Sequence, residues 1–140
     1  MKLFLDANVL VAILNKEYPI YSFASRILSL EDNKNYKIYT SSICIAIAFY
    51  FSEKKSGYKV ARNKIELLVN KISISNVGER EVKLSMKNKK INDIEDGFEY
   101  YAALQSKCDI IITEDINDFY FSSIPILNCK KFVEEYLLKK

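Results

Sequence analysis

Asp109-Ile110-Ile111-Ile112-Thr113 is the stretch of sequence that decides the fold class. An uninterrupted run of β-branched residues is typical of a strand that is covered on both faces, as strands in parallel sheets are. Shorter strand-like segments lie at residues 2–5, 36–39, 72–74 and 124–127. Helical patterns separate all of them, and strands that alternate with helices predict a parallel sheet wrapped by helices. We therefore expect an α/β fold, formed by one domain over residues 1–140.

The composition excludes several kinds of chemistry. The chain has no histidine, which rules out Ser-His-Asp and Cys-His nucleophiles, His-ligated zinc and His general bases. No G-x-G-x-x-G motif is present, which rules out a dinucleotide site of that type. The chain has three cysteines, which lie far apart in the sequence, and this favours reduced thiols over disulfides. Catalysis would therefore have to use carboxylates, hydroxyls, Lys, Arg or a metal ion.

The sequence gives no sign of a membrane-bound or secreted protein. It has no run of 18 apolar residues, and Asp6 and Asn8 interrupt the apolar N-terminus before a signal peptide could form. We expect no membrane association and a cytoplasmic location.

Charged residues are strongly segregated along the chain. Between Lys54 and Lys90 there are 11 Lys or Arg and three Glu, whereas between Asp93 and Asp118 there are eight Asp or Glu and one Lys. A basic stretch suits a polyanion and an acidic stretch suits a cation. The alternative is that both stretches are solvated helix faces.

Acidic residues that are distant in sequence should meet at one edge of the predicted sheet. Asp6 ends the first strand, Asp115 follows the strand at 109–113, and Asp96 lies in the helix that leads into that strand. Ligands of open α/β sheets bind beyond the carboxyl ends of the strands. Carboxylates gathered there repel one another unless a cation is present, and oxygen ligands without His favour Mg²⁺ or Mn²⁺. The sequence therefore predicts a metal site at Asp6, Asp96 and Asp115.

Neighbouring polar residues have simpler structural interpretations. Asp93 can be only a helix cap, Asn8 can bond the backbone of the turn after the first strand, and Asp118 can cap a short turn. We expect Glu95 and Glu99 to be exposed.

Motifs along the whole chain resemble those of PIN domains. Leu5-Asp6-Ala7-Asn8-Val9-Leu10 resembles their opening L-D-x-N-V-L. Asp93-Ile94-Glu95-Asp96, which precedes Tyr100-Tyr101-Ala102-Ala103, resembles their D-x-x-D before an Ala-rich helix. Ile112-Thr113-Glu114-Asp115-Ile116-Asn117-Asp118-Phe119 resembles their closing I-T-x-[DN]-x-x-D-F. The order of the motifs, rather than any one of them, makes the resemblance specific.

The resemblance implies a fold, an activity and a set of partners. The fold would be a three-layer α/β/α sandwich around a central parallel sheet of about five strands. The activity would be Mg²⁺- or Mn²⁺-dependent cleavage of RNA, as in the VapC-type toxins of toxin–antitoxin pairs, with an antitoxin protein as partner. A homodimer is a further hypothesis, suggested by aromatic residues of the first half of the chain: Tyr21, Phe23, Phe49, Tyr50 and Phe51.

The site residues of the family can be carried over one by one. Asp6, Asp96 and Asp115 would hold the metal ion. Residues that orient ligands or water would be Asn8, Ser41, Asp93, Thr113 and Asp118. The basic stretch, rather than the family pattern, suggests the contacts with RNA phosphates: Lys54, Lys55, Lys59 and Arg62. This binding should weaken with salt.

One departure from the family pattern stands in the second motif. The family places a Glu on the helix after Thr40-Ser41-Ser42, and the aligned position here is Ile47. Glu53 is six residues further on, about 240° around the helix, so it cannot replace the missing acid. The departure leaves an alternative function open, a catalytically decayed PIN-like module that binds RNA or protein without cleavage.

One helix is expected to be buried, and one alternative fold class remains open. The helix at residues 43–54 is apolar nearly all round, so we expect it to be buried. The alternative fold class is a phosphoacceptor receiver domain, which also has acids at strand ends. A receiver would need paired acids after the first strand, but here Ala7 follows Asp6, which disfavours this alternative.

Overall fold

A computed structural model describes residues 1–139; Lys140, the last residue of the expected domain, lies outside the described residues. Five strands of the described chain form one sheet in the order β3-β2-β1-β4-β5, and every neighbouring pair is parallel. The strands are β1 (Lys2–Leu5), β2 (Lys37–Ser41), β3 (Ser73–Ser75), β4 (Ile110–Ile112) and β5 (Ile126–Leu127). The predicted parallel sheet is therefore confirmed.

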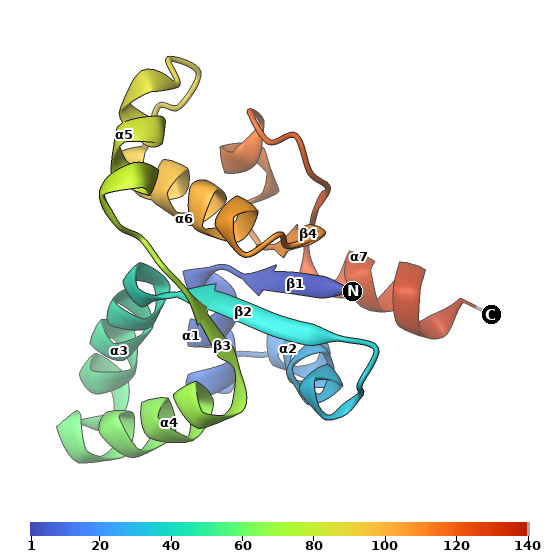
Figure 1. Cartoon of the computed structure of the whole chain (residues 1–140). Coiled ribbons are helices and arrows are strands. Elements are labelled where there is room, and N and C mark those ends of the chain that lie inside the picture. The colour runs from blue at the N-terminus through green and yellow to red at the C-terminus, as the bar shows by residue number, and fades with distance from the viewer. Residues whose placement is uncertain (140) are drawn as a thin grey trace.

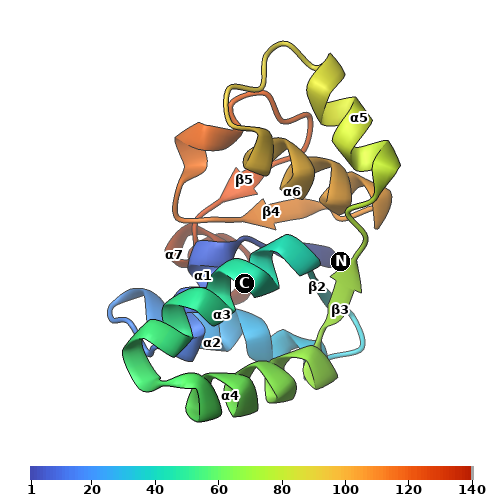
Figure 2. The ribbon, with the colours of Figure 1, turned by 90° about the vertical axis from the view of Figure 1, so that its left-hand side faces the viewer.

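Helices cover both faces of the sheet (Figure 1). On one face lies α6 (Ile94–Gln105), with α5 (Glu79–Lys87) packed against it. The other face carries α1 (Ala7–Leu14), α2 (Ile20–Ser29), α3 (Ser42–Ser56), α4 (Tyr58–Lys71) and α7 (Cys129–Phe132), which continues into the π-helical segment η3 (Val133–Leu138). Short 3-10 turns, η1 (Leu30–Asp32) and η2 (Ile116–Phe119), join the elements. The result is the expected three-layer α/β/α arrangement, which Figure 2 shows from the side.

The two central strands are buried on both faces. Ile110, Ile111 and Ile112 of β4 and the apolar residues of β1 are almost fully excluded from solvent. This burial follows from the helices on either side of the sheet, as the unbroken β-branched run predicts.

The order of the strands places the ends of β1 and β4 side by side. The chain runs outward from β1 to β2 and β3, and then returns to the other side of β1 to form β4 and β5. Leu5 pairs with Ile112, and the Asp6 N–H donates to the Ile112 carbonyl at 3.0 Å. Such a reversal of strand order creates a crevice at the carboxyl ends of the strands. The order also excludes the receiver alternative, because receivers of the flavodoxin-like type have the order 2-1-3-4-5.

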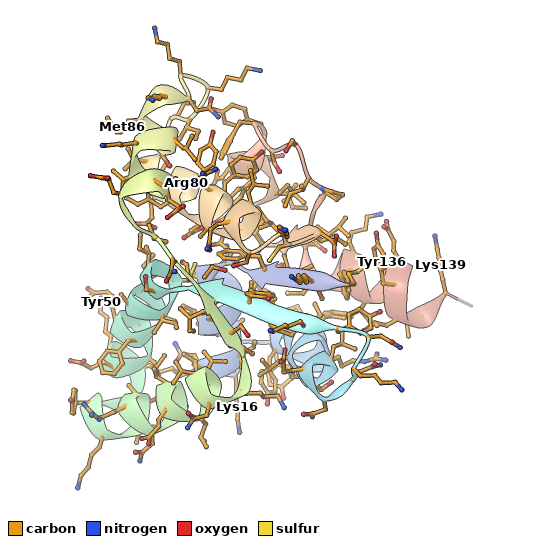
Figure 3. The ribbon with its side chains drawn as sticks, viewed as in Figure 1. Lys16, Tyr50, Arg80, Met86, Tyr136 and Lys139 are labelled. Carbon is orange, nitrogen blue, oxygen red and sulfur yellow. The ribbon has the colours of Figure 1, made fainter. Side chains whose placement is uncertain are left out.

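The prediction that the helix at residues 43–54 is buried nearly all round is wrong. In α3 the buried side chains of the described chain are Cys44, Ala48 and Ser52, which lie along one line of the helix. Tyr50 is 59% exposed and Phe51 is 46% exposed, and Figure 3 shows Tyr50 on the outside of the molecule. Since α3 packs between α1 and α4 at the margin of the layer, only part of its surface is covered. Ile45 and Ile47 are partly buried against the core, whereas Tyr50 and Phe51 are exposed.

Among residues 1–139, no helix combines the length and the apolar character that crossing a bilayer would require.

Candidate functional site

A cavity of about 450 Å³ opens at the carboxyl ends of β1 and β4. Among the described residues, eight acidic side chains and no Lys or Arg line it. The acidic residues are Asp6, Glu17, Asp93, Glu95, Asp96, Glu99, Asp115 and Asp118. The structure thus brings Asp6, Asp96 and Asp115 together in one cavity, from three separate parts of the chain.

Asp6 is held rigidly at the junction of β1 and α1. Its Oδ1 accepts a hydrogen bond from the Ala7 N–H at 2.6 Å, which makes it the N-cap of α1. Its Oδ2 accepts a hydrogen bond from the Thr113 hydroxyl at 2.7 Å. The side chain is buried, and the N-terminal end of α1 favours its negative charge.

Asn8 links the Asp6 side of the cavity to the Asp115 side. Its Nδ2 donates to the Thr113 hydroxyl oxygen and to Asp115 Oδ2, both at 3.1 Å. Its Oδ1 accepts from the Glu114 N–H at 3.1 Å. Thr113 also accepts from the Asp115 N–H at 3.1 Å. These bonds fix the positions of the two carboxylates relative to each other. The interpretation that Asn8 only bonds the backbone of the turn after β1 is therefore wrong.

The first turn of α6 contributes two further carboxylates. Asp93 is the N-cap of the helix and accepts from the Glu95 N–H at 3.0 Å, and its side chain also lines the cavity. Asp96 lies three residues later and is half-buried. Burial and then the nearby carboxylates, with Asp93 and Asp6 first among them, raise the pKa of Asp96 to about 7.

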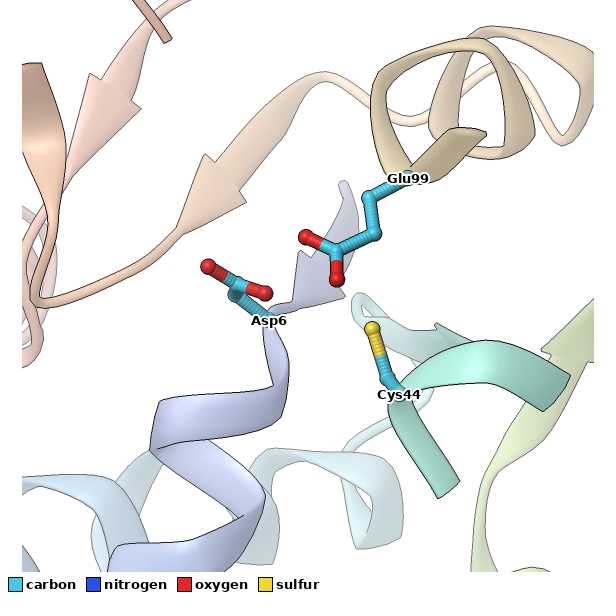
Figure 4. Close-up of side chains that lie close together, drawn as sticks. All are labelled: Asp6, Cys44 and Glu99. Atoms are coloured by element: carbon cyan, nitrogen blue, oxygen red, sulfur yellow. The ribbon is translucent and has the colours of Figure 1, made fainter. Parts of the chain in front are cut away.

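The expectation that Glu99 is exposed is wrong, although Glu95 is exposed as expected. Glu99 is 2% exposed, and its carboxylate meets Asp6 and Cys44, with one ligand atom of each within 4.8 Å of the others (Figure 4). Within residues 1–139, its Oε2 atom has no hydrogen-bond partner. Burial, followed by the adjacent Asp6, raises the pKa of Glu99 to about 11. The signal that could have found it is its spacing from Asp96, because residues three apart lie on the same face of a helix.

The wall of the cavity on the α3 side is apolar. Ile47, which stands where the family pattern has a Glu, lines the cavity together with Phe51 one turn later. Glu53 is exposed and is not among the residues that line it. In the described part of α3, no acid therefore reaches the cavity.

The donor set of the cavity fits a hard divalent cation. Its ligands are carboxylate oxygens in excess, without a Lys or Arg in the described lining to neutralise them, and one buried carboxylate oxygen is unpartnered. Oxygen-only sites favour Mg²⁺ or Mn²⁺ over softer metals. The Cys44 thiol beside Glu99 is a soft ligand, and it does not belong to such a set.

The predicted basic contacts lie outside the cavity and differ in their surroundings. Lys55 Nζ donates to the Asn15 carbonyl at 2.7 Å, so it binds the backbone at the end of α1. Arg62 donates to the Tyr58 hydroxyl at 2.8 Å. Lys54 and Lys59 are exposed on α3 and α4.

The structure gives Ser41 a capping role in α3. It is the N-cap of α3, and its hydroxyl oxygen accepts from the Cys44 N–H at 3.2 Å. Among the described residues that line the cavity, Ser41 is not included.

Fold and cavity together define a class of protein, a parallel α/β domain with an acidic site at the carboxyl ends of its strands. A PIN domain family model matches residues 2–117, and the chain belongs to the PIN domain family.

Similar proteins cover nearly the full length of the chain. Ribonuclease VapC1 of Aquifex aeolicus (strain VF5) is 27% identical over 139 residues, which are 96% of this chain and 95% of that protein. The structure of VapBC-1 from nontypeable Haemophilus influenzae matches 93% of this chain and 99% of its own, with a TM-score of 0.70 and 19% identity. VapBC2 from Rickettsia felis, bound to a DNA fragment from its promoter, matches 91% of this chain and 98% of its own, with a TM-score of 0.69 and 19% identity. At these identities the two structures show a shared fold.

Replacement of Asp96 by Asn should stabilise the metal-free protein at high pH. Because the folded protein raises the pKa of this carboxyl above that of the unfolded chain, its favourable contribution is complete below about pH 4 and is lost as the pH rises through about 7. An amide cannot ionise, so the variant avoids this loss. After solvent screening we expect a gain of about 1 kcal/mol at pH 8, which is a few degrees in Tm.

Thermal unfolding followed by circular dichroism in EDTA, at pH 5 and pH 8, measures this difference. Glu53→Gln is the matched control, since Glu53 is an exposed acid outside the cavity. A gain for Asp96→Asn that is no larger at pH 8 than at pH 5 would contradict the electrostatic explanation.

Proposed function

We propose that this protein is a Mg²⁺- or Mn²⁺-dependent endoribonuclease that hydrolyses phosphodiester bonds in RNA, and that it is the toxin of a toxin–antitoxin pair. The observation that supports the proposal most is that Asp6, Asp96 and Asp115 line one cavity of a PIN domain. This cavity lies where the strand order reverses, at the carboxyl ends of β1 and β4. The name of the Aquifex relative, Ribonuclease VapC1, supports RNA as the substrate. An RNA substrate also fits the cytoplasmic location expected from the sequence.

In this proposal the three aspartates are the metal ligands, and their neighbours keep them in place. Thr113 and Asn8 hold Asp6 and Asp115 through the hydrogen bonds that join β1 to β4. Asp93 and Asp118 line the same cavity and can orient water by accepting hydrogen bonds from it. When bound, a divalent cation lowers the pKa of water and neutralises the negative charge that develops on the phosphate.

The proposed metal site is acidic, whereas the surface that would bind RNA has to be basic. The acidic cavity by itself repels a phosphate, so the backbone needs basic side chains outside it. Lys54, Lys59 and Arg62 are exposed on α3 and α4, in the layer that also contributes Ile47 and Phe51 to the cavity wall. We propose that these three basic residues contact RNA phosphates. Lys55 is left out, because its ammonium group is bound to the Asn15 carbonyl.

A second candidate function follows from Ile47. The apolar side chain stands in the cavity where the family pattern has an acid, which favours a decayed module that binds RNA or protein without cleaving it. Such a module would bind the metal weakly and would cleave no RNA at any metal concentration.

The proposed protein partner is an antitoxin that covers α3 and α4. Large apolar side chains are exposed there, among them Tyr50, Phe51, Tyr58 and Leu67, the last of which is 73% exposed. Burial of such a surface is the main source of binding energy in protein complexes. The names of the Haemophilus and Rickettsia structures, VapBC-1 and VapBC2, support a partner of this kind. A second copy of this chain on the same surface is the alternative.

Titration of Mg²⁺ or Mn²⁺ into the wild-type protein with a generic single-stranded RNA tests the activity. We expect cleavage that requires the metal and stops in EDTA. Asp96→Ala removes a carboxylate ligand and should slow cleavage by at least about 100-fold. Glu53→Gln should cleave as the wild type does. Absence of cleavage at every metal concentration would favour the decayed module, and equal rates for Asp96→Ala and the wild type would reject the site.

The double variant Lys54→Gln/Lys59→Gln tests the RNA-binding surface. If each side chain neutralises one phosphate, the slope of log affinity against log salt should fall by about 1.4 for a single strand. Fluorescence anisotropy of a labelled RNA over a range of salt concentrations measures both the affinity and the slope. Metal affinity should stay unchanged, because neither residue lines the cavity. An unchanged salt slope would assign both lysines to an ordinary solvated surface.

A further inference from the structure

Glu99 is a buried carboxylate that the family pattern leaves without a role. It lies in the middle of α6, is 2% exposed, and has one oxygen, Oε2, with no hydrogen-bond partner in the described chain. A buried polar atom without a hydrogen-bond partner destabilises the folded protein, so we expect this oxygen to bind a ligand. The carboxylate points into the acidic cavity, toward Asp6 (Figure 4).

We infer that Glu99 supplies, from α6, the fourth carboxylate ligand of the divalent-cation site, in place of the acid that is missing from α3. The inference rests on the proposed function, since both concern the same cation.

The geometry at Glu99 suits an ion shared with Asp6. Ligand atoms of Asp6, Glu99 and Cys44 lie within 4.8 Å of one another. Two oxygens that bind one Mg²⁺ at about 2.1 Å are themselves about 3 to 4 Å apart, so a small side-chain movement would bring both into contact with the ion. Asp6 is fixed by its bonds to Ala7 and Thr113, which leaves this movement to Glu99.

The helix α6 can present two ligands together. Asp96 and Glu99 are three residues apart, and both line the cavity. Residues at this spacing share one face of a helix. Together with Asp6 and Asp115, which line the same cavity, these two residues would give the site four carboxylates although Ile47 replaces the acid of α3.

Neither α3 nor the thiol offers a better candidate. The α3 residues that line the cavity are Ile47 and Phe51, and Glu53 is exposed elsewhere on that helix. Cys44 is fully buried against the carboxylates, but a thiol is a poor ligand for Mg²⁺ or Mn²⁺. Among the carboxylates of the described lining, Glu99 is the one that is buried and has an oxygen without a hydrogen-bond partner.

Isothermal titration calorimetry with Mn²⁺ on the full chain tests the inference without reference to RNA. Glu99→Gln preserves the shape of the side chain and removes its charge, and we expect it to weaken Mn²⁺ binding at least tenfold. Glu53→Gln removes the same charge outside the cavity and should leave the affinity within about twofold of the wild type. Cys44→Ala should also bind as the wild type does. Equal affinities for Glu99→Gln and the wild type, or a tenfold loss for Cys44→Ala, would overturn the inference.

A crystal of the wild-type protein soaked in Mn²⁺ gives a test that needs no variant. We expect an anomalous peak within about 2.5 Å of a Glu99 carboxylate oxygen. A peak in the cavity that lies beyond contact with Glu99 would overturn the inference.

Cleavage assays on the same samples separate this inference from the proposed function. Mn²⁺ binding that depends on Glu99, without cleavage of RNA, supports the ligand and rejects the ribonuclease. Cleavage of RNA by a wild-type protein whose Mn²⁺ affinity Glu99→Gln leaves unchanged rejects the ligand alone.

Discussion

Mutual repulsion among carboxylates held in one cavity is the constraint on which the rest of the structure depends. Burial and neighbouring negative charge raise the pKa values of Asp96 and Glu99, so the metal-free protein keeps these groups together at a cost in stability. Hydrogen bonds from Thr113 and Asn8 prevent Asp6 and Asp115 from moving apart. A bound divalent cation would replace this repulsion with attraction to each carboxylate, which is why we propose a metal ion in the cavity.

The strand order brings residues that are distant in sequence together in this cavity. Because β1 lies between β2 and β4, the residue after β1 is adjacent to the residues after β4, although 107 positions separate Asp6 from Thr113. The helix α6 then crosses one face of the sheet and brings Asp96 and Glu99 to the same point. The site therefore forms where the segments that follow β1 and β4 meet the N-terminal half of α6.

Sequence patterns predict those parts of the molecule that depend on local periodicity or on strand direction. The run at residues 110–112 predicts a doubly covered strand, and the acids at strand ends predict a shared edge, because parallel strands have only one carboxyl edge. The prediction for α3 is wrong because an apolar helix surface looks the same in sequence whether it faces the core or solvent. Glu99 is missed because α6 lies between the sheet and α5, so charged and apolar residues are buried on it alike. The bond from Lys55 to Asn15 joins residues 40 positions apart and has no sequence signal.

The central claim is that the acidic residues form one site for a hard divalent cation. Thermal unfolding of the wild-type chain at pH 7.5, in EDTA and in increasing Mn²⁺, tests it most directly, with Asp6→Asn measured in parallel. Binding to the folded state at 100 times the dissociation constant contributes about 2.7 kcal/mol, so the Tm of the wild type should rise by several degrees and that of Asp6→Asn should rise much less. A wild-type Tm that is the same in EDTA and in saturating Mn²⁺ would contradict the account.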